Sequence, residues 1–573
     1  MLLLKHLLAA GLLLSSLANA QQNQSSDIEY NVIALLNQTL YKSVSVVVDN
    51  VSYPLNSNTT FPILFSGKAP LAQSGYHYVK TYTNDDVLAE SFMRQPVNTT
   101  TPHEFFNRTW NSHNNAQFPQ IYSPLESISR IKSNLHRDNE IPTLHIVGNS
   151  SQIDLLNRNI SSDITVESNL TYLSLQDAFQ FEGVELSLSG RSSRWMPKLS
   201  YNLKLKKKDG LYGYRRLKLR ALYLDPSYLR EQVAYDFVKS VGLISSEFSY
   251  VRVFMNDQEL GLFGLIDTFK SNWLSNVFAD GKDSYKNGYL YQGLYTSPAS
   301  SAQNHTSDLS YYDNSTAYED GQYKLKKKAS GGKKDDFDPL IDFTKFIANA
   351  PTNSSDAVEK WNERLDTDSF LRSLALEVLA GYSDGYLTMA DNYYLYQNPK
   401  NDQFIYISSD MDITLGATMF TMSDIWSGNY STFPGWGKRP LVKQIMLVPE
   451  FKQTFTHLLQ NITAQLVNPD VTQPRLNDLV NMIREDVEWD QTLARVGKGV
   501  AMDSDSSVVG DAVGTNMPDG LDMNAVMDLA SRLQTGVPFD IAVNGPTGHS
   551  SLSGLKEWIS NIHQNTTQFF SQQ

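Results

Sequence analysis

The sequence predicts an α+β protein in which an N-terminal β-sandwich precedes a larger domain of alternating sheets and helices. In residues 27–96 the apolar runs are short, alternate with polar residues and are separated by Asn, Ser, Gly and Pro, a pattern typical of antiparallel strands. From residue 181 onward, strand patterns and amphipathic helices follow one another. The 573 residues are 41% hydrophobic and 19% charged, an ordinary globular composition with room for about two to four domains.

The first residues and the overall charge indicate where the protein acts. Residues 1–20 read as a secretory signal, with Lys5 before an apolar stretch and Ala18-Asn19-Ala20 as the cleavage site. No later run approaches the roughly 20 apolar residues that span a bilayer, so we expect a secreted protein without a membrane span. The net charge of -13, with no strong basic patch to offset it, argues against a nucleic-acid partner.

Acceptor sequons for N-glycosylation support export. There are about fifteen of them, and their density favours a eukaryotic secretory route, with each glycosylated asparagine on the surface. The sites that we single out are Asn37, Asn58, Asn107, Asn169, Asn314, Asn353, Asn461 and Asn565. The chain has no cysteine, so its stability must come from core burial instead of disulfides.

Shifts in composition divide the chain. We assign residues 21–100 to the β-sandwich, residues 101–180 to a linker and the start of the next domain, and residues 181–573 to that domain. Residues 280–338 are rich in Ser, Asn, Gly, Tyr and Lys and show little periodicity, which predicts a long surface insertion.

Residues 181–267 combine strands with one helix. The helix is predicted to begin at Asp225-Pro226 and to end at Gly242, because Pro is favoured in the first turn and Gly at the C-terminal cap. Its apolar stripe consists of Leu229, Val233, Phe237 and Val241. A hairpin that turns at Asn256-Asp257 follows.

Residues 377–416 hold the densest set of candidate functional groups. The pattern predicts a helix that ends near Gly381, a loop, and two strands at 392–396 and 403–407 joined by a turn. This places Asp384 and Asn392 ahead of the first strand, with Asp410 and Asp412 just after the second. Several oxygen ligands would therefore gather at one end of a hairpin, which suits a divalent cation that holds phosphates.

These residue types are those that phosphoryl transfer requires. The reaction needs a carboxylate for the nucleophile, an Asn and an Asp for the metal, and a Lys that is usually paired with a helical Glu. A strand Lys, Glu231, Asp384, Asn392 and Asp410 occur here in the usual chain order, although the HRDxxxxN and DFG motifs are absent. Two other interpretations remain open: the paired aspartates cap a turn, or they are the two acids of a glycoside hydrolase.

Four separated motifs resemble the CotH family, which comprises atypical kinases of bacterial spore coats and has cell-surface homologues in fungi of the Mucorales. They are GRSSRWMPKLSYNLKL, RLKLRALYLDPSYLRE, VRVFMNDQELGLFGL and DNYYLYQNPKNDQFIYISSDMDITLG. They occur in the family order within residues 181–416. The resemblance implies an atypical protein-kinase-like bilobal domain that uses ATP with Mg2+ or Mn2+ to phosphorylate Ser/Thr of secreted or coat proteins.

The resemblance also implies roles for individual residues. Asp384 stands where the family has its catalytic Asp, Asn392 where it has the metal-facing Asn, and Asp410 where it has the metal-binding Asp. Asp412 is an additional candidate ligand. Ser409 replaces the tryptophan that precedes the metal-binding Asp in the family, which puts in doubt the packing behind the metal but not the ligand.

Two lysines are candidates for the residue that faces the nucleotide phosphates. Lys198 matches the proline-lysine strand of the family and is slightly favoured, whereas Lys218 lies on the strand directly before the helix, where kinase topology would expect it. Glu231 on that helix is the expected partner of the lysine. Arg194, in the same motif as Lys198, completes the expected nucleotide-binding set.

The same resemblance raises a non-enzymatic alternative, because some fungal homologues are surface invasins. A non-catalytic adhesin on a kinase scaffold would bind host-cell receptors and would be associated with the spore or cell wall. The adhesive stretch of those homologues falls near residues 291–304, but this chain does not spell it convincingly. The kinase hypothesis is therefore preferred.

Overall fold

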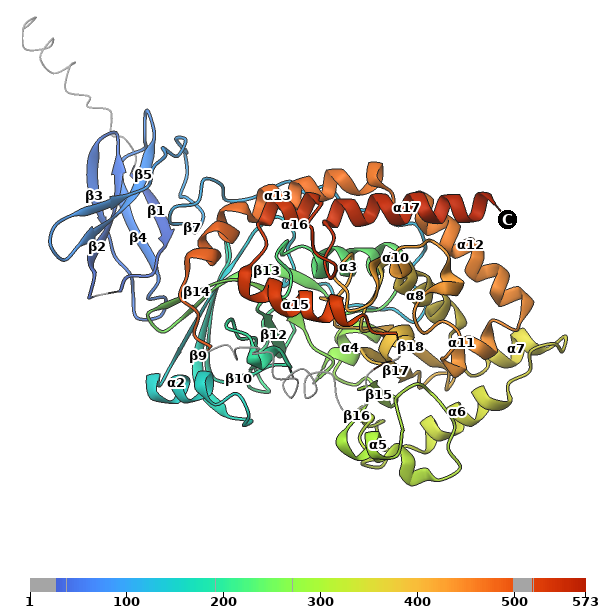
Figure 1. Ribbon diagram of the computed structural model, residues 1–573. Coiled ribbons are helices and arrows are strands. Elements are labelled where there is room, and N and C mark those ends of the chain that lie inside the picture. The colour runs from blue at the N-terminus through green and yellow to red at the C-terminus, as the bar shows by residue number, and fades with distance from the viewer. Residues whose placement is uncertain are drawn as a thin grey trace, which may run out of the picture. The chain divides into compact units, whose positions relative to one another are not determined.

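The computed structural model describes residues 27–37, 39–190, 192–270, 272–497, 518 and 520–572 (Figure 1). The proposed signal segment, residues 1–20, lies outside the described residues. The chain forms two compact units, of which the first contains the described residues up to Ser112 together with Thr171–Gln180 and Asp257–Glu259. The second contains the rest of the chain and all the candidate catalytic, metal and nucleotide residues.

The first unit is built from two small sheets that share one core. One sheet has the order β4 (Leu64–Ala69), β1 (Ile28–Ile33), β7 (Glu104–Phe105), and the other β3 (Val51–Leu55), β2 (Tyr41–Val48), β5 (Tyr76–Tyr82), β6 (Val87–Ala89). Alternate residues of β2, Val44, Val46 and Val48, point into the core that both sheets line. The predicted N-terminal β-structure is confirmed.

The first unit continues past residue 100, where the sequence suggested its boundary. Strand β7 pairs with β1 in parallel, and the buried carboxylate of Glu104 accepts hydrogen bonds from Tyr78 at 2.7 Å and Arg94 at 3.2 Å. The polar segment after residue 100 therefore closes the core of this unit and is more than a linker.

A closed barrel of seven strands belongs to the second unit, except for the residues of β9, β10 and β14 that fall within Thr171–Gln180 and Asp257–Glu259. Around the barrel the order is β10 (Ala178–Leu188), β11 (Tyr201–Lys204), β12 (Arg216–Arg220), β14 (Gln258–Asp267), β13 (Phe248–Met255), β8 (Thr143–Gly148) and β9 (Thr165–Leu173). The hairpin of β13 and β14 turns at Asn256-Asp257, as predicted. Both strands are buried along almost their whole length, so the barrel forms a core of its own.

Helix α3 (Arg230–Ser240) follows β12. All four residues of its predicted apolar stripe are fully buried, and Gly242 follows the helix with a φ of 73°. Its predicted start at Asp225-Pro226 is wrong by about one turn. Tyr228 has a φ of 58°, which is incompatible with a helix, and the Asp225 carboxylate instead accepts the backbone N–H of Arg230 at 2.8 Å.

A second sheet has the order β16 (Tyr323–Lys327), β15 (Leu290–Gly293), β17 (Tyr393–Gln397), β18 (Phe404–Ser408). The last two strands match the predicted hairpin to within one residue. The first two come from residues 280–338, so the expectation that this whole segment is a surface insertion is wrong. Strands of four and five residues, one of them rich in lysine, are too short to give a clear period of two.

Helices cover this sheet and complete the second unit. Helix α8 (Thr367–Ala380) packs on β18 and on α12 (Pro449–Gln465), and α17 (Leu555–Ser571) contacts α12 and α13 (Pro469–Thr492) (Figure 1, orange and red). The shorter elements are α2 (Ser150–Arg158), η1 (Ser192–Trp195), α4 (Trp273–Phe278), α5 (Pro298–Ala302), η2 (Ser315–Tyr318), α6 (Asp338–Asn349), α7 (Ala357–Asn362), α9 (Tyr386–Met389), α10 (Met422–Ile425), η3 (Tyr430–Thr432), α11 (Pro440–Ile445), α15 (Met523–Thr535) and α16 (Phe539–Asn544). None of the helices within the described ranges has the length and apolar character needed to cross a bilayer.

Candidate functional site

Asp384, Asn392 and Asp410 meet at one end of the β17–β18 hairpin. The side-chain amide of Asn392 donates to the Asp384 carboxylate at 2.7 Å and to its backbone carbonyl at 3.2 Å. The N–H of Ser409 donates to the Asn392 carbonyl at 2.9 Å, so the residue before β17 lies against the segment after β18. The spacing that placed these oxygen ligands at one end of a hairpin thus corresponds to their arrangement in space.

The backbone at this end is held in an uncommon conformation. Asn392 and Asp410 have φ values of 54° and 55°, in the left-handed region that Asn and Asp tolerate better than most residues. Such residues concentrate where surrounding contacts over-determine the chain. A further contact is the hydrogen bond from the Ser383 N–H to the Ile413 carbonyl at 3.0 Å, which joins the loop of Asp384 to the segment that follows Asp412.

A buried carboxyl group braces the loop that carries Asp384. Glu377 on α8 is 1% exposed and accepts the backbone N–H of Leu387 at 2.6 Å. A Cβ atom on Gly385 would lie 2.4 Å from the Glu377 Oε1 atom, so the loop passes directly over this carboxyl group. Burial raises the pKa of Glu377 to about 8. The group is therefore mostly protonated at neutral pH and adds little charge beneath the site.

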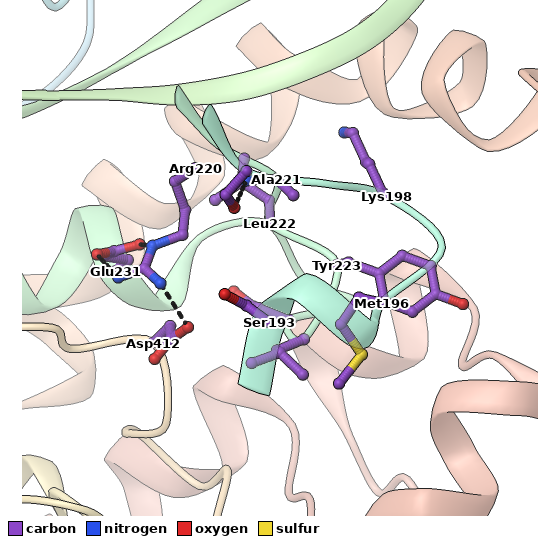
Figure 2. A pocket seen from close by; sticks show the side chains of 12 residues that line it. Ser193, Met196, Lys198, Arg220, Ala221, Leu222, Tyr223, Glu231 and Asp412 are labelled. Atoms are coloured by element: carbon purple, nitrogen blue, oxygen red, sulfur yellow. Dashed lines mark hydrogen bonds and ion pairs between the residues drawn. The ribbon is translucent and has the colours of Figure 1, made fainter. Parts of the chain in front are cut away.

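Arg220, at the end of β12, is the centre of the charge network. Its guanidinium binds Glu231 at 2.9 Å, Asp412 at 3.0 Å and also Asp410. Figure 2 shows its side chain pointing towards Glu231 and Asp412. Burial lowers the pKa of Arg220, but the carboxylates of Asp412 and Glu231 outweigh that effect and raise it above its ordinary value. One cation thereby joins the barrel, helix α3 and the segment after β18.

Lys218 lies on the same face of β12, two residues before Arg220. Its ammonium group is 3.8 Å from the Asp410 carboxylate, and its side chain is only 15% exposed. Burial, together with the neighbouring Arg220, lowers the pKa of Lys218 to about 7. Glu231, which the sequence suggested as the partner of a lysine, is hydrogen-bonded to Arg220.

Lys198 lines the same region but its charge is engaged elsewhere. Its ammonium group binds the Asp490 carboxylate on α13 at 2.6 Å and the Leu262 carbonyl at 2.5 Å, and it is 3% exposed. In Figure 2 it points towards neither Glu231 nor Asp412. Arg194 is bound to the exposed carboxylate of Asp163 at 2.8 Å. The structure therefore brings Lys218 and Glu231 to the aspartates, but not Lys198 or Arg194.

A small pocket opens beside this network (Figure 2). Arg220, Glu231 and Asp412 form a polar wall of the pocket. Its apolar lining comes from Met196 and from residues 221–224, which follow Arg220 in the chain. The lining residues are Ser193, Met196, Lys198, Ser200, Arg220, Ala221, Leu222, Tyr223, Leu224, Asp225, Glu231 and Asp412.

The chemistry of the donor set fits a hard divalent cation. Asn392, Asp410 and Asp412 offer only oxygen ligands, the type that Mg2+ and Mn2+ prefer, and the Asp410 side chain is 40% exposed. In the described part of the chain, no three His, Cys, Asp or Glu residues are already arranged as a metal site. The Arg220 guanidinium neutralises two of these carboxylates, Asp410 and Asp412.

Sequence reasoning did not identify Arg220. The signal was available in RLKLR, because the period of two places Lys218 and Arg220 on one face of a strand. The pattern does not indicate that carboxylates far along the chain lie against that face, since Arg220 and Asp410 are separated by 190 residues.

The proposed glycosylation sites differ in accessibility. Asn58, Asn107, Asn169, Asn314 and Asn353 are exposed. Asn37, Asn461 and Asn565 are half-buried, and the amide nitrogens of the last two donate to Tyr122 at 2.7 Å and to Trp426 at 2.8 Å. Because a glycan is attached to that nitrogen, modification of Asn461 or Asn565 would disrupt these hydrogen bonds.

Comparison with known proteins identifies the family of the chain. The chain is 25% identical over 490 residues to Invasin CotH3 of Rhizopus delemar, which covers 83% of this chain and 77% of the relative. It is 24% identical over 307 residues to Inner spore coat protein H of Bacillus subtilis, covering 54% of this chain and 78% of the relative. The family model described as CotH kinase protein matches residues 186–497, a span that holds every candidate catalytic, metal and nucleotide residue. Because this match covers more than half of the chain, the protein belongs to the CotH family.

Proposed function

We propose that the protein is a secreted atypical protein kinase that transfers the γ-phosphate of ATP to Ser/Thr of secreted, spore-coat or cell-wall proteins. The observation that carries this proposal is a chain of contacts. Asn392 is hydrogen-bonded to Asp384 and to the backbone of Ser409, and the neighbouring Asp410 lies 3.8 Å from the Lys218 ammonium on β12. The name of the family supports the same reaction. In this proposal the barrel with α3 acts as one lobe of a kinase-like domain, and the second sheet with its helices acts as the other.

Each residue has a role that its environment supports. The Asp384 carboxylate, oriented by the Asn392 amide, accepts the proton of the substrate hydroxyl. The hydroxyl oxygen attacks the γ-phosphorus, and the bond from that phosphorus to the bridging oxygen of ADP breaks. Lys218 binds the phosphates. Lys218 is preferred to Lys198 because the ammonium of Lys198 is already bound to Asp490.

Asn392, Asp410 and Asp412 would hold Mg2+ or Mn2+, which supplies positive charge to the phosphates and the leaving group. To open this site, Arg220 must release Asp410 and Asp412 while it keeps its buried partner Glu231. Arg220 then remains as a positive group that faces the phosphates, which is the kind of preorganised charge on which phosphoryl transfer depends.

Transfer to a protein acceptor tests the proposal. Purified protein is incubated with labelled ATP, Mg2+ or Mn2+, and a generic acceptor protein; we expect labelled Ser/Thr, and a decrease of about 10²-fold or more in Asp384→Asn. We expect Lys218→Met to weaken ATP binding, and Lys198→Met to lower stability because it removes one of the two cations that bind the buried Asp490 carboxylate and leaves only Arg495. Transfer that is unchanged in Asp384→Asn would contradict the proposal.

A second candidate is a non-catalytic adhesin. The names of two relatives, Invasin CotH3 and Invasin CotH2, both of Rhizopus delemar, favour it. An adhesin would bind host-cell receptors without ATP, and the wild type and Asp384→Asn would bind them equally well. Cell-binding measurements on both proteins, with and without EDTA, separate this function from the kinase reaction.

A further inference from the structure

Four cationic side chains gather beside the candidate site. They are Arg216 on β12, Lys270 just after β14, and Lys324 and Lys326 on β16, and we call them the basic cluster. The Arg216 carbonyl accepts the N–H of Thr268 at 3.3 Å, which brings the segment of Lys270 against β12.

An aromatic stack joins this segment to the second sheet. The Phe269 ring lies on the Tyr394 ring with centroids 3.9 Å apart, and the Lys326 ammonium is 5.9 Å from the centroid of Tyr394. Register places Lys324 opposite Gln292 on β15, and Gln292 opposite Tyr394 on β17. Cations from three separate elements are therefore held on one surface by backbone and ring contacts.

The three lysines of the basic cluster are not balanced by acids, whereas Arg216 has the carboxylate of Glu185 as an electrostatic neighbour. Burial, together with the neighbouring cations Lys270 and Lys324, lowers the pKa of Lys326 to about 7. Burial and the cations Arg216 and Lys324 also lower the pKa of Lys270. Across the described ranges, none of the three lysines has a carboxylate within ion-pair distance, and the buried Nε atom of Arg216 has no hydrogen-bond partner.

The basic cluster continues directly from the candidate site. Arg216 and Lys218 lie two residues apart on one face of β12, about 7 Å along the strand. Tyr394 is on β17, and Asn392 lies just before that strand, two residues away. A ligand that binds Lys218 with one phosphate can therefore present a second anionic group to the basic cluster.

We propose that the basic cluster is a second phosphate-binding subsite next to Lys218 of the candidate site. That Lys218 itself binds phosphate rests on the proposed function, whereas the positive charge of the basic cluster does not. Adenine and ribose are neutral and would leave the positive charge of the lysines uncompensated in a partly buried region, which is unfavourable. Phosphate groups match the cluster, and they have two sources: the phosphate chain of a nucleotide or a phosphoryl group already present on the acceptor protein.

Binding of inorganic triphosphate tests the subsite without catalysis. The affinity is measured by calorimetry in EDTA at low ionic strength, where screening is weak. The double variant Lys270→Gln/Lys324→Gln removes two exposed side chains, so folding should be unaffected. We expect at least about tenfold weaker binding in the variant, because it loses charge-assisted contacts to phosphate. Lys345→Gln, an exposed lysine on α6, is the matched control and should bind as the wild type does.

Two further titrations identify the source of the phosphate. ATP and a phosphoserine peptide are each titrated into the wild type and the double variant. A loss of affinity for ATP assigns the subsite to the nucleotide, a loss for the peptide assigns it to the acceptor, and a loss for triphosphate alone assigns it to free polyphosphate. Triphosphate that does not bind the wild type, or that binds the double variant equally well, would overturn the proposal. Triphosphate binding that persists in a protein without transferase activity would refute only the proposed function.

Discussion

Replacement of Arg220 by Met tests the charge network at the centre of the site. Met retains an unbranched apolar stem and removes the guanidinium. The Glu231 and Asp412 side chains, 2% and 14% exposed, then keep their burial but lose their cation. Breaking a buried ion pair by removing one partner costs about 3–5 kcal/mol. Asp410, at 40% exposure, is well solvated and adds at most about 1 kcal/mol.

Urea unfolding of the full chain, followed by tryptophan fluorescence at pH 7 in EDTA, measures this loss. We expect the free energy of unfolding of Arg220→Met to fall by about 3–5 kcal/mol. Excess Mg2+ should restore part of it, because a cation bound by Asp410 and Asp412 takes over the neutralisation that Arg220 provided, by mass action on the folded state. The wild type should gain less from Mg2+, since Arg220 competes for the same carboxylates.

Arg484→Met is the matched control for this measurement. Arg484 binds Asp540 at 2.8 Å, but the two side chains are 39% and 60% exposed, so its loss should cost less than about 1 kcal/mol. If Arg220→Met is no more destabilising than Arg484→Met, the reasoning from burial is refuted. If Mg2+ stabilises both variants and the wild type equally, the assignment of Asp410 and Asp412 as cation ligands is refuted.

Two further predictions concern the loop that carries Asp384. Glu377 has a folded pKa raised to about 8 from 4.5, so the stability tied to its protonated form is present below pH 4.5 and is lost as the pH rises through 8. Glu377→Gln should therefore become more stable than the wild type by up to about 1.4 kcal/mol per pH unit across that window; urea unfolding at pH 5, 7 and 9 checks this, and a constant difference would contradict it. Gly381 has a φ of 64°, and a Cβ atom there would lie 2.5 Å from the Trp558 ring, so Gly381→Ala should cost about 2–4 kcal/mol from backbone strain and overpacking together. The matched control is Gly536→Ala, because Gly536 has a φ of 74° and no neighbour within 4 Å of an added Cβ atom; it should lose only about 1–2 kcal/mol of stability from backbone strain. Equal losses of thermal stability in the two variants would show that the Trp558 ring moves aside without cost and would contradict the overpacking.

Local patterns in the chain predict local structure well. The hairpin at Asn256-Asp257, the end of α8 at Gly381 and the strands around Asn392 all follow from periodicity and turn residues. The short strands β15 and β16 do not, because four or five residues with exposed lysines carry no clear period. The proline rule predicts that α3 starts at Asp225, but the positive φ of Tyr228 and the hydrogen bond from the Arg230 N–H to the Asp225 carboxylate delay the helix to Arg230.

By itself the sequence determined which residues could carry the chemistry, and that Asp384, Asn392 and Asp410 lie at one end of a hairpin, because both depend on spacing within about 30 residues. Only the tertiary structure decided which cation stands among them. Along the chain Lys198 is slightly favoured over Lys218, but Asp490, 292 residues from Lys198, binds its ammonium, and Arg220 occupies the carboxylates beside Lys218. Ion pairing depends on which charges folding buries together, and no local pattern encodes that.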